Sequence, residues 1–380
     1  MRWLMTIALA ACGACGNAKV ELDPVAAADA TAFAARWVAA TATSCDPVKV
    51  AGLIDDDAFR ARVASHLSSL KGELVAHELG SEAAAQIVCA WQAQAASYGL
   101  LRVRTLDGEP RPLLRRLVKI ERTGVVAVAY EDLKLGARRS DHDVRVIDVY
   151  SYVGGQWLSE LLGDNAAALV AASSGDAASS SSKVQQAVAL SKAGKPTEAL
   201  ALVDQLPPAV RHTRETQLMR VKFGEAISNA AHLQALDELA ATFPDDPSIA
   251  MMEIDGAFLR SDWDAALHYI DVLDAAVGGD PFQNAIRAEA YLARKHPGDV
   301  ETARARADAA TKAEPTLAKG WFATLDVALA QARWADALAA MDVLSTTFGS
   351  TWDDVKLRTI SAFAGLVATP EYAAWLARRP

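Results

Sequence analysis

Residues 301–315 read Glu-Thr-Ala-Arg-Ala-Arg-Ala-Asp-Ala-Ala-Thr-Lys-Ala-Glu-Pro, and this stretch decides the fold of the C-terminal half. Ala303 and Ala310 stand seven residues apart, and Pro315 follows five residues later. Alanine is the strongest helix former, and its small side chain lets a second helix approach closely. Proline ends a helix because it has no amide hydrogen to donate. The stretch therefore predicts a tightly packed helix that stops near Pro315.

The alanine at position 303 belongs to a series that runs through residues 183–380. Similar alanines recur at intervals of 31 to 37 residues: Ala199, Ala235, Ala266, Ala337 and Ala373. After Lys183 the hydrophobic period is helical, and no strand pattern returns. A unit of about 35 residues with two helices indicates stacked hairpins, because one hairpin cannot bury both of its apolar faces. We therefore expect a mainly α protein with an α-solenoid over residues 183–380.

The period and the spacing resemble the tetratricopeptide repeat. Trp321 lies sixteen residues before Ala337, where that family often has tryptophan. Twelve residues before the marked alanine the family prefers glycine or alanine, and only Ala187 conforms. The other units have larger side chains there: Phe223, Ile254, Tyr291 and Leu325. The resemblance implies tetratricopeptide-like hairpins that are wider or shifted in register; an irregular helical bundle is the alternative.

The N-terminal half combines two hydrophobic periods. Helical spacing covers residues 25–41 and about 47–97, with interruptions near Gly52 and Gly80. Strict alternation then predicts half-buried strands, at residues 101–106, 118–121 and 143–146. We expect residues 25–172 to form an α+β domain, with helices first and an antiparallel sheet after them.

Two glycine-containing turns mark the expected hairpins, and the Gly-Gly pair is a hairpin signal because type I′ turns need positive φ angles at both central positions. Thr123-Gly124 separates two strand runs, and Gly154-Gly155 separates residues 144–153 from residues 156–161. Residues 144–157 resemble the terminal hairpin of NTF2-like (SnoaL-like) domains. That resemblance implies a curved sheet packed around a helix, often with an enclosed pocket; a generic hairpin is the alternative.

A serine-rich segment separates the two halves. Residues 173–182 read Ser-Ser-Gly-Asp-Ala-Ala-Ser-Ser-Ser-Ser. Low-complexity segments of this composition behave as flexible chains. We expect a linker at residues 173–182, between the α+β domain and the repeat domain of residues 183–380.

The N-terminus has the pattern of an export signal. One arginine precedes a short apolar run, which ends in small residues. Leu9-Ala10-Ala11-Cys12 resembles the lipobox of bacterial lipoproteins. This resemblance implies a signal peptide at residues 1–11, acylation of Cys12 and a tether at residues 12–24. Gly13 rather than aspartate follows Cys12, which implies the periplasmic face of the outer membrane of a Gram-negative bacterium.

Two alternatives stand beside this interpretation of the N-terminus. Cys15 is a second and poorer match to the lipobox, because Cys12 occupies its third upstream position. The whole segment also fits an ordinary buried N-terminal element. Among the cysteines that remain, Cys45 and Cys89 form a disulfide in an oxidising compartment or stay as buried thiols.

Composition excludes some functions. Lys and Arg total 38 against 47 Asp and Glu, and a net charge of −9 argues against nucleic acid as the main partner. No phosphate-loop, dinucleotide, zinc-protease or nucleophile-elbow motif is present. The sequence therefore predicts no catalytic residue, no cofactor and no metal site.

Two polar segments of the sequence each allow two interpretations. Asp141-His142-Asp143 is a polar turn or a base or metal ligand, and an NTF2-like pocket would add acid–base groups at Asp148, Tyr130 and Tyr150. A basic stretch covers residues 102–122, with positive charges at Arg102, Arg104, Arg111, Arg115, Arg116, Lys119 and Arg122. It is interpreted as a solvated outer face of the sheet, or as a contact with anionic lipid.

Envelope lipoproteins that resemble tetratricopeptide proteins commonly hold other proteins together. The first helix of each hairpin lines the concave face of such a solenoid. Mapping this chain onto the repeat puts a mixture of apolar and charged side chains on that face: Arg220, Met251, Asp255, Phe258, Lys319, Phe322 and Asp326. The resemblance implies a non-enzymatic, membrane-anchored adaptor for a protein or peptide. The alternatives are a small-ligand binder or enzyme with an NTF2-like pocket, and a purely structural envelope protein.

Overall fold

Helices precede the sheet in the N-terminal part of the chain. The computed structural model describes residues 22–42, 44–67, 79–93, 95–119, 126–172, 176–244 and 246–378. The early helices are α1 (Ala27–Thr41), α2 (Pro47–Gly52), α3 (Asp56–Ser65) and α5 (Ser81–Gln92). The Asp46 and Asp55 carboxylates accept backbone N–H bonds at the starts of α2 and α3. These caps define helix starts, because the first amides of a helix have no partner within it.

The sheet is an antiparallel meander. Its strands follow one another in space as β2 (Ala95–Leu106), β3 (Glu109–Lys119), β4 (Val126–Arg138), β5 (Val144–Ser151) and β6 (Gln156–Trp157). The short β1 (Leu22–Asp23) pairs with the end of β4. Asp107 and Gly108 join β2 to β3 with φ angles of 54° and 78°, as a tight hairpin turn requires.

One core lies between this sheet and the N-terminal helices. Phe33, Trp37 and Phe59 are each at most 1% exposed, and they share a cluster with Leu114 and Leu133 of the sheet. Trp37 donates its indole N–H to the Tyr98 hydroxyl, 3.1 Å away, so the polar edge of the ring is satisfied. This face of the sheet is fully covered.

Cys45 and Cys89 form a disulfide in the structure. Their Cα atoms lie 5.2 Å apart, within the usual range for such a bond. The bridge joins the segment between α1 and α2 to α5. In the chain-entropy model a loop of this size stabilises the fold by about 3–4 kcal/mol.

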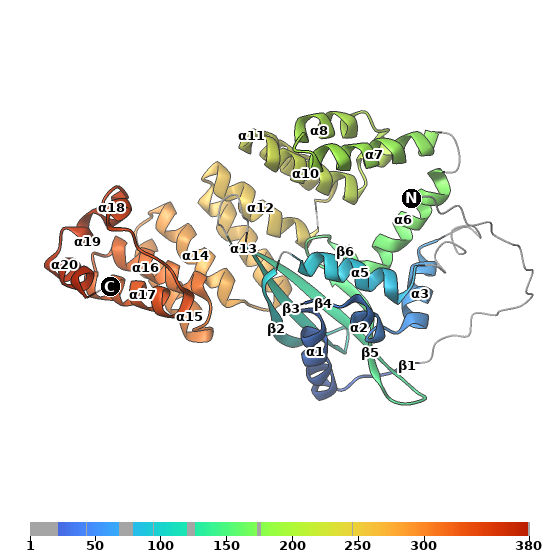
Figure 1. Ribbon diagram of the computed structural model, residues 1–380, viewed down its shortest axis with the longest axis horizontal. Helices are drawn as coiled ribbons and strands as arrows, with labels where there is room; N and C mark the ends of the chain where they lie inside the picture. The colour runs from blue at the N-terminus through green and yellow to red at the C-terminus, as the bar shows by residue number, and fades with distance from the viewer. Residues whose placement is uncertain are drawn as a thin grey trace, which may run out of the picture.

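Helical hairpins make up the C-terminal part. After α6 (Leu158–Ala172) the pairs are α7 (Asp176–Lys192) with α8 (Pro196–Asp204), α10 (Arg214–Ile227) with α11 (Asn229–Thr242), α12 (Pro247–Arg260) with α13 (Trp263–Val277), α14 (Pro281–Arg294) with α15 (Asp299–Ala313), and α16 (Ala318–Ala330) with α17 (Trp334–Phe348). The short α9 (Pro208–Arg211) precedes α10, and α18 (Asp354–Leu357), η1 (Ser361–Phe363), α19 (Ala364–Val367) and α20 (Pro370–Ala377) end the stack. The chain is therefore mainly helical with a small antiparallel sheet, and Figure 1 shows the hairpins following one another.

The marked alanines lie where the hairpins are packed. Ala199, Ala235, Ala266, Ala303 and Ala337 are at most 3% exposed. Ala373 is exposed, and Tyr372 and Trp375 are buried in its place. The expected sixth unit is therefore irregular, and its first helix is divided into short pieces.

The register is shifted, as the large side chains at the expected glycine positions suggested. Phe223 is buried, and the close approach occurs at Gly224. A Cβ atom on Gly224 would lie 2.6 Å from the carbonyl oxygen of Ala231, so only glycine fits where α10 meets the start of α11. The shift is one residue at this hairpin.

Some boundaries predicted from the sequence are wrong. The linker expected at residues 173–182 is already helical from Asp176, since α7 begins there and packs along α8. Serine is only modestly worse than alanine inside a helix, so tertiary contacts outweigh the composition. The helix expected to reach residue 97 ends at Gln92, and residues 95–97 pair with β3.

The strand expected at residues 156–161 stops at Trp157. The Glu160 carboxylate accepts the Trp157 amide at 2.9 Å, and the Ser159 amide donates to Asp148, so the chain turns into α6. The hairpin expected at Thr123-Gly124 lies outside the described residues, as do Cys12, Cys15 and residues 1–21. In the part of the chain that is described, no helix combines the length and apolarity needed to span a bilayer.

Candidate interaction surfaces

The second face of the sheet is covered by the helical stack. Leu113, Tyr130 and Tyr152 of the sheet form one buried cluster with residues of α12 and α13, namely Ile254, Ile270, Leu273 and Val277. Figure 1 shows the sheet beside α12 and α13, in the middle of the stack. Both faces of the sheet are therefore buried, one by its own helices and the other by the repeats.

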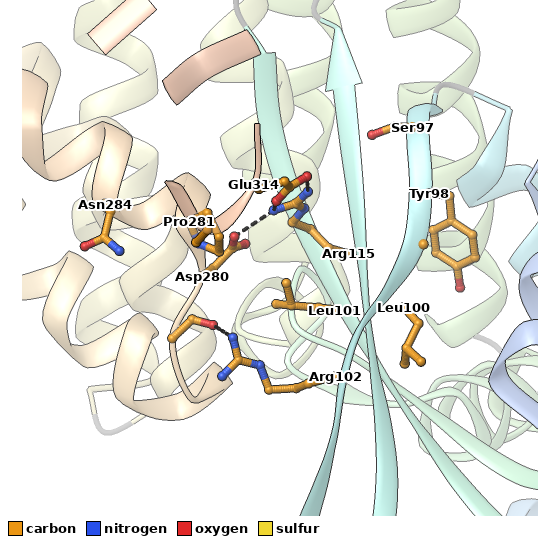
Figure 2. A pocket seen from close by; sticks show the side chains of 13 residues that line it. Ser97, Tyr98, Leu100, Leu101, Arg102, Arg115, Asp280, Pro281, Asn284 and Glu314 are labelled. Carbon is orange, nitrogen blue, oxygen red and sulfur yellow. Dashed lines mark hydrogen bonds and ion pairs between the residues drawn. The ribbon is translucent and has the colours of Figure 1, made fainter. Parts of the chain in front are cut away.

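Arginines of β2 bind the C-terminal end of α13. Arg102 donates to the carbonyl oxygens of Gly278 and Gly279, and Arg104 donates to that of Ala276. The last carbonyls of a helix lack partners within it and carry partial negative charge. The two guanidinium groups supply both the missing donors and the opposite charge. Figure 2 shows Arg102 reaching from the strand to this turn.

Asp280 is the centre of a second set of contacts. Its carboxylate is completely buried and begins α14 by accepting the Phe282 amide at 2.8 Å. Arg115 of β3 donates to Asp280 at 2.7 Å and to Glu314 at 2.8 Å. The Tyr130 hydroxyl donates to the other oxygen of Asp280 at 2.6 Å. Sheet and stack are thus joined through one carboxylate.

Electrostatics keep these groups in the required protonation states. Burial acts to lower the pKa of Arg115, but the bond to Glu314 and the charge of Asp280 raise it above its ordinary value. Burial, and then the charge of Asp280, raises the pKa of Tyr130 well above its ordinary value. Arg115 therefore stays charged and Tyr130 stays a hydroxyl donor at every physiological pH.

These contacts correct the interpretation of the basic stretch at residues 102–122. Arg102, Arg104 and Arg115 bind the helical stack, and Arg116 binds the Trp91 carbonyl and Glu131 inside the α+β part. Within the described side chains of the stretch, three arginines thus join the sheet to the stack, and none of the arginines named here is a free solvated or lipid-facing charge. Arg122 lies outside the described residues.

A large cavity lies beside this joint (Figure 2). It has a volume of about 710 Å³ and runs along residues 97–102 of β2, opposite the start of α14 and the end of α15. The charged side chains that line it are bound to protein groups, as Arg115 is to Asp280 and Glu314.

A second hollow lies between the first helices of successive hairpins. We call it the α14–α16 groove; its volume is about 460 Å³, and its lining is Glu289, Leu292, Ala293, Asp326, Leu329, Ala330 and Ala362. Lys319 pairs with Glu289 at 2.6 Å. Among the described residues Asp326 has neither an ion-pair nor a hydrogen-bond partner, so its charge is available.

The surroundings of Asp326 change its acidity. Its side chain is open to water, but protein surrounds the groove on several sides. Desolvation, and then repulsion from Glu289, raises the pKa of Asp326 to about 6, while Lys319 acts in the opposite direction. Asp326 is thus ionised at neutral pH, although desolvation and the charge of Glu289 both disfavour its ionised form.

The structure divides the seven residues predicted for a partner-binding face. Asp326 lines the α14–α16 groove, and Lys319 pairs with Glu289 of its lining. Phe322, also on α16, is 39% exposed and lies near the ring of Trp352, which follows α17. Asp255 is exposed on α12. These residues remain proposals for the partner-binding surface.

The other three predicted residues are not free. Met251 and Phe258 are half-buried and pack against the cluster that α12 shares with the sheet. Arg220 is 6% exposed and pairs with Asp204 and Glu238. These three positions therefore stay predictions for the partner-binding face, with side chains that already contact the α+β part or neighbouring helices.

The groups proposed for an enzymatic pocket do not converge. Asp148 is fully buried and binds Arg62 and Ser159, whereas Tyr130 binds Asp280 and Gln283 of the helical stack. Tyr150 packs against the rings of Tyr152 and Trp157. His142 is 78% exposed in the turn between β4 and β5. Within the described residues no group of His, Cys, Asp and Glu has the geometry of a metal site.

Comparisons with known proteins add little. No protein family model and no curated protein matches the chain. A crystal structure of PilW, described as a widely conserved type IV pilus biogenesis factor, aligns over 52% of this chain and 91% of its own, with 14% identity and a TM-score of 0.41. A mutant of MamA aligns over 44% of this chain and 97% of its own, with 18% identity and a TM-score of 0.33. Likenesses at these scores carry no information about function.

Replacing Arg115 by alanine tests the joint between sheet and stack. Asp280 would then be a buried carboxylate without its cation, and we expect a loss of about 3–5 kcal/mol in the free energy of unfolding. Arg304→Ala is the control, because Arg304 is 45% exposed and 3.8 Å from Asp308. That change should cost less than about 1 kcal/mol. Urea unfolding of both variants measures the difference; equal losses would contradict the role of Arg115.

Proposed function

We propose that this protein is an envelope adaptor that holds a segment of another protein on its helical repeats. The observation that carries the proposal is the α14–α16 groove. Its floor is aliphatic, with Leu292 and Leu329, and its rim carries the unpaired carboxylate of Asp326. Apolar anchors beside a fixed charge suit the recognition of a protein segment.

The position of the groove supports the same proposal. The sheet covers α12 and α13, so that part of the stack already has an intramolecular partner. The groove begins one hairpin further on and has no covering element among the described residues. We infer that the α+β part fixes the stack in place and that the C-terminal hairpins bind the partner.

Membrane attachment is a further part of the proposal. It rests on the lipobox-like Leu9-Ala10-Ala11-Cys12, with residues 1–11 as a signal peptide and residues 12–24 as a tether. The disulfide between Cys45 and Cys89 fits an oxidising compartment such as the periplasm. We propose the periplasmic face of the outer membrane as the location.

The alternative of a ligand pocket in the α+β part has less support. The candidate acid–base groups Asp148 and Tyr130 are bonded to different protein groups, Asp148 to Arg62 and Ser159, and Tyr130 to Asp280. The resemblance of residues 144–157 to NTF2-like domains remains an interpretation of the sequence.

Site-specific photo-crosslinking in native cells tests the adaptor role. A photoreactive amino acid at the exposed Ala330 of the groove should give a discrete adduct with one protein. The control is the same amino acid at Ala309, an exposed alanine on α15 that does not line the groove. Adducts at both positions alike, or at neither, would contradict binding in the groove.

Substituting the cysteines of the N-terminus tests the anchor. Cys12→Ala should move the protein from the membrane fraction to the soluble fraction of the envelope, because the acyl chains supply the attachment. Cys15→Ala should leave it in the membrane fraction. Mass spectrometry of the N-terminal peptide gives a direct readout, and a mature protein that keeps an unmodified Met1 would rule out acylation.

A further inference from the structure

The first helices of three successive hairpins carry an acidic residue at the same position. The ninth residue of α12, α14 and α16 is Asp255, Glu289 and Asp326, respectively. The spacing follows the repeat, so equivalent positions on neighbouring helices have the same charge. In the groove Glu289 and Asp326 both belong to the lining, and the charge of Glu289 disfavours the charged form of Asp326.

Apolar residues follow the acid at the same offsets in each helix. Three positions later stand Phe258, Leu292 and Leu329. Residues three apart on a helix share one face, so each acid lies beside an apolar side chain. In α14 and α16 this face is the wall of the groove. In α12 Phe258 packs against the cluster that α12 shares with the sheet, whereas no sheet residue lines the groove of the two later helices.

The available charge in the groove is negative. Lys319 neutralises Glu289, with both side chains about a quarter exposed. Asp326 has no such partner among the described residues, and no other cationic side chain lines the groove within that part of the chain. A cationic group of a partner would reduce the repulsion between Asp326 and Glu289. It would also give Asp326 the ion pair that it lacks within the described residues.

We propose that the α14–α16 groove binds a segment that presents a lysine or arginine beside aliphatic side chains, with Asp326 as the contact for the positive charge. This inference rests on the adaptor role proposed above and specifies the chemistry of the partner. The aliphatic side chains pack against Leu292 and Leu329, and the ammonium or guanidinium group pairs with Asp326.

Fluorescence anisotropy with labelled peptides tests this chemistry on the full chain. Three peptides share one leucine- and alanine-rich sequence and carry lysine, glutamine or glutamate at two central positions. We expect the lysine peptide to bind about tenfold more tightly than the glutamate peptide. Asp326→Asn should weaken binding of the lysine peptide about fivefold and change the glutamine peptide less than about twofold. Asp308→Asn, on the exposed face of α15, is the matched control and should change neither.

The pH dependence is a second readout. Because the pKa of Asp326 is about 6, its carboxylate is charged above that pH and neutral below it. The groups that act on it electrostatically are Glu289 and Lys319. Lysine on the peptide stays protonated throughout. Binding of the lysine peptide should therefore weaken as the pH falls from about 7.5 to about 5, and Asp326→Asn should remove most of that change.

The outcomes separate this inference from the proposed function. Equal binding of the lysine and glutamate peptides, or binding of the lysine peptide that Asp326→Asn leaves unchanged, overturns the proposed chemistry. A discrete adduct at Ala330 together with that result leaves the adaptor role standing with a different partner. If the lysine peptide does not bind even at about 1 mM, the inference is wrong. Ala330→Trp, which fills the groove, should abolish binding of each peptide and so locates the site.

Discussion

The carboxylate of Asp280 is completely buried between the sheet and the helical stack, where a negative charge without a partner would cost several kcal/mol. Arg115 of β3 supplies the positive charge, and Tyr130 of β4 donates a hydrogen bond to the Asp280 carboxylate. The same carboxylate begins α14. The start of α14 and the middle of the sheet therefore have a fixed relative position, and the burial of Leu113 and Ile270 in one cluster depends on it.

This arrangement assigns different tasks to parts of the repeat stack. The end of α13 is held by Arg102 and Arg104, and the surface of α12 is shared with the sheet. An isolated solenoid would offer α12, the first helix of its hairpin, to a partner. In this chain α12 packs against the sheet, and the α14–α16 groove lies further on. The unpaired carboxylate of Asp326 favours a ligand with a positive charge.

The sequence predicted the helices and their spacing, because helix–helix contacts leave a local trace: Ala266, Ala303 and Ala337 are buried where two helices meet. It predicted β5 from alternation and a strand run after Thr123-Gly124, but not the bounds of β4, because β4 is buried along most of its length and its pattern does not alternate. The hairpin at Asp107-Gly108 had a recognisable signal that was missed. The contacts between sheet and stack leave no local signal in the sequence, since Arg104 and the Ala276 carbonyl lie 172 residues apart. For the same reason the sequence did not indicate that Met251 and Phe258 pack against the cluster shared with the sheet.

Native-state hydrogen exchange of the intact protein in increasing denaturant tests most directly whether sheet and stack form one unit. If the buried Asp280 joins them, the amides of β3 and of α14 should lose protection together, with the same opening free energy. If α14 exchanges freely while β3 remains protected, the two parts are independent, and the coupling described here is contradicted.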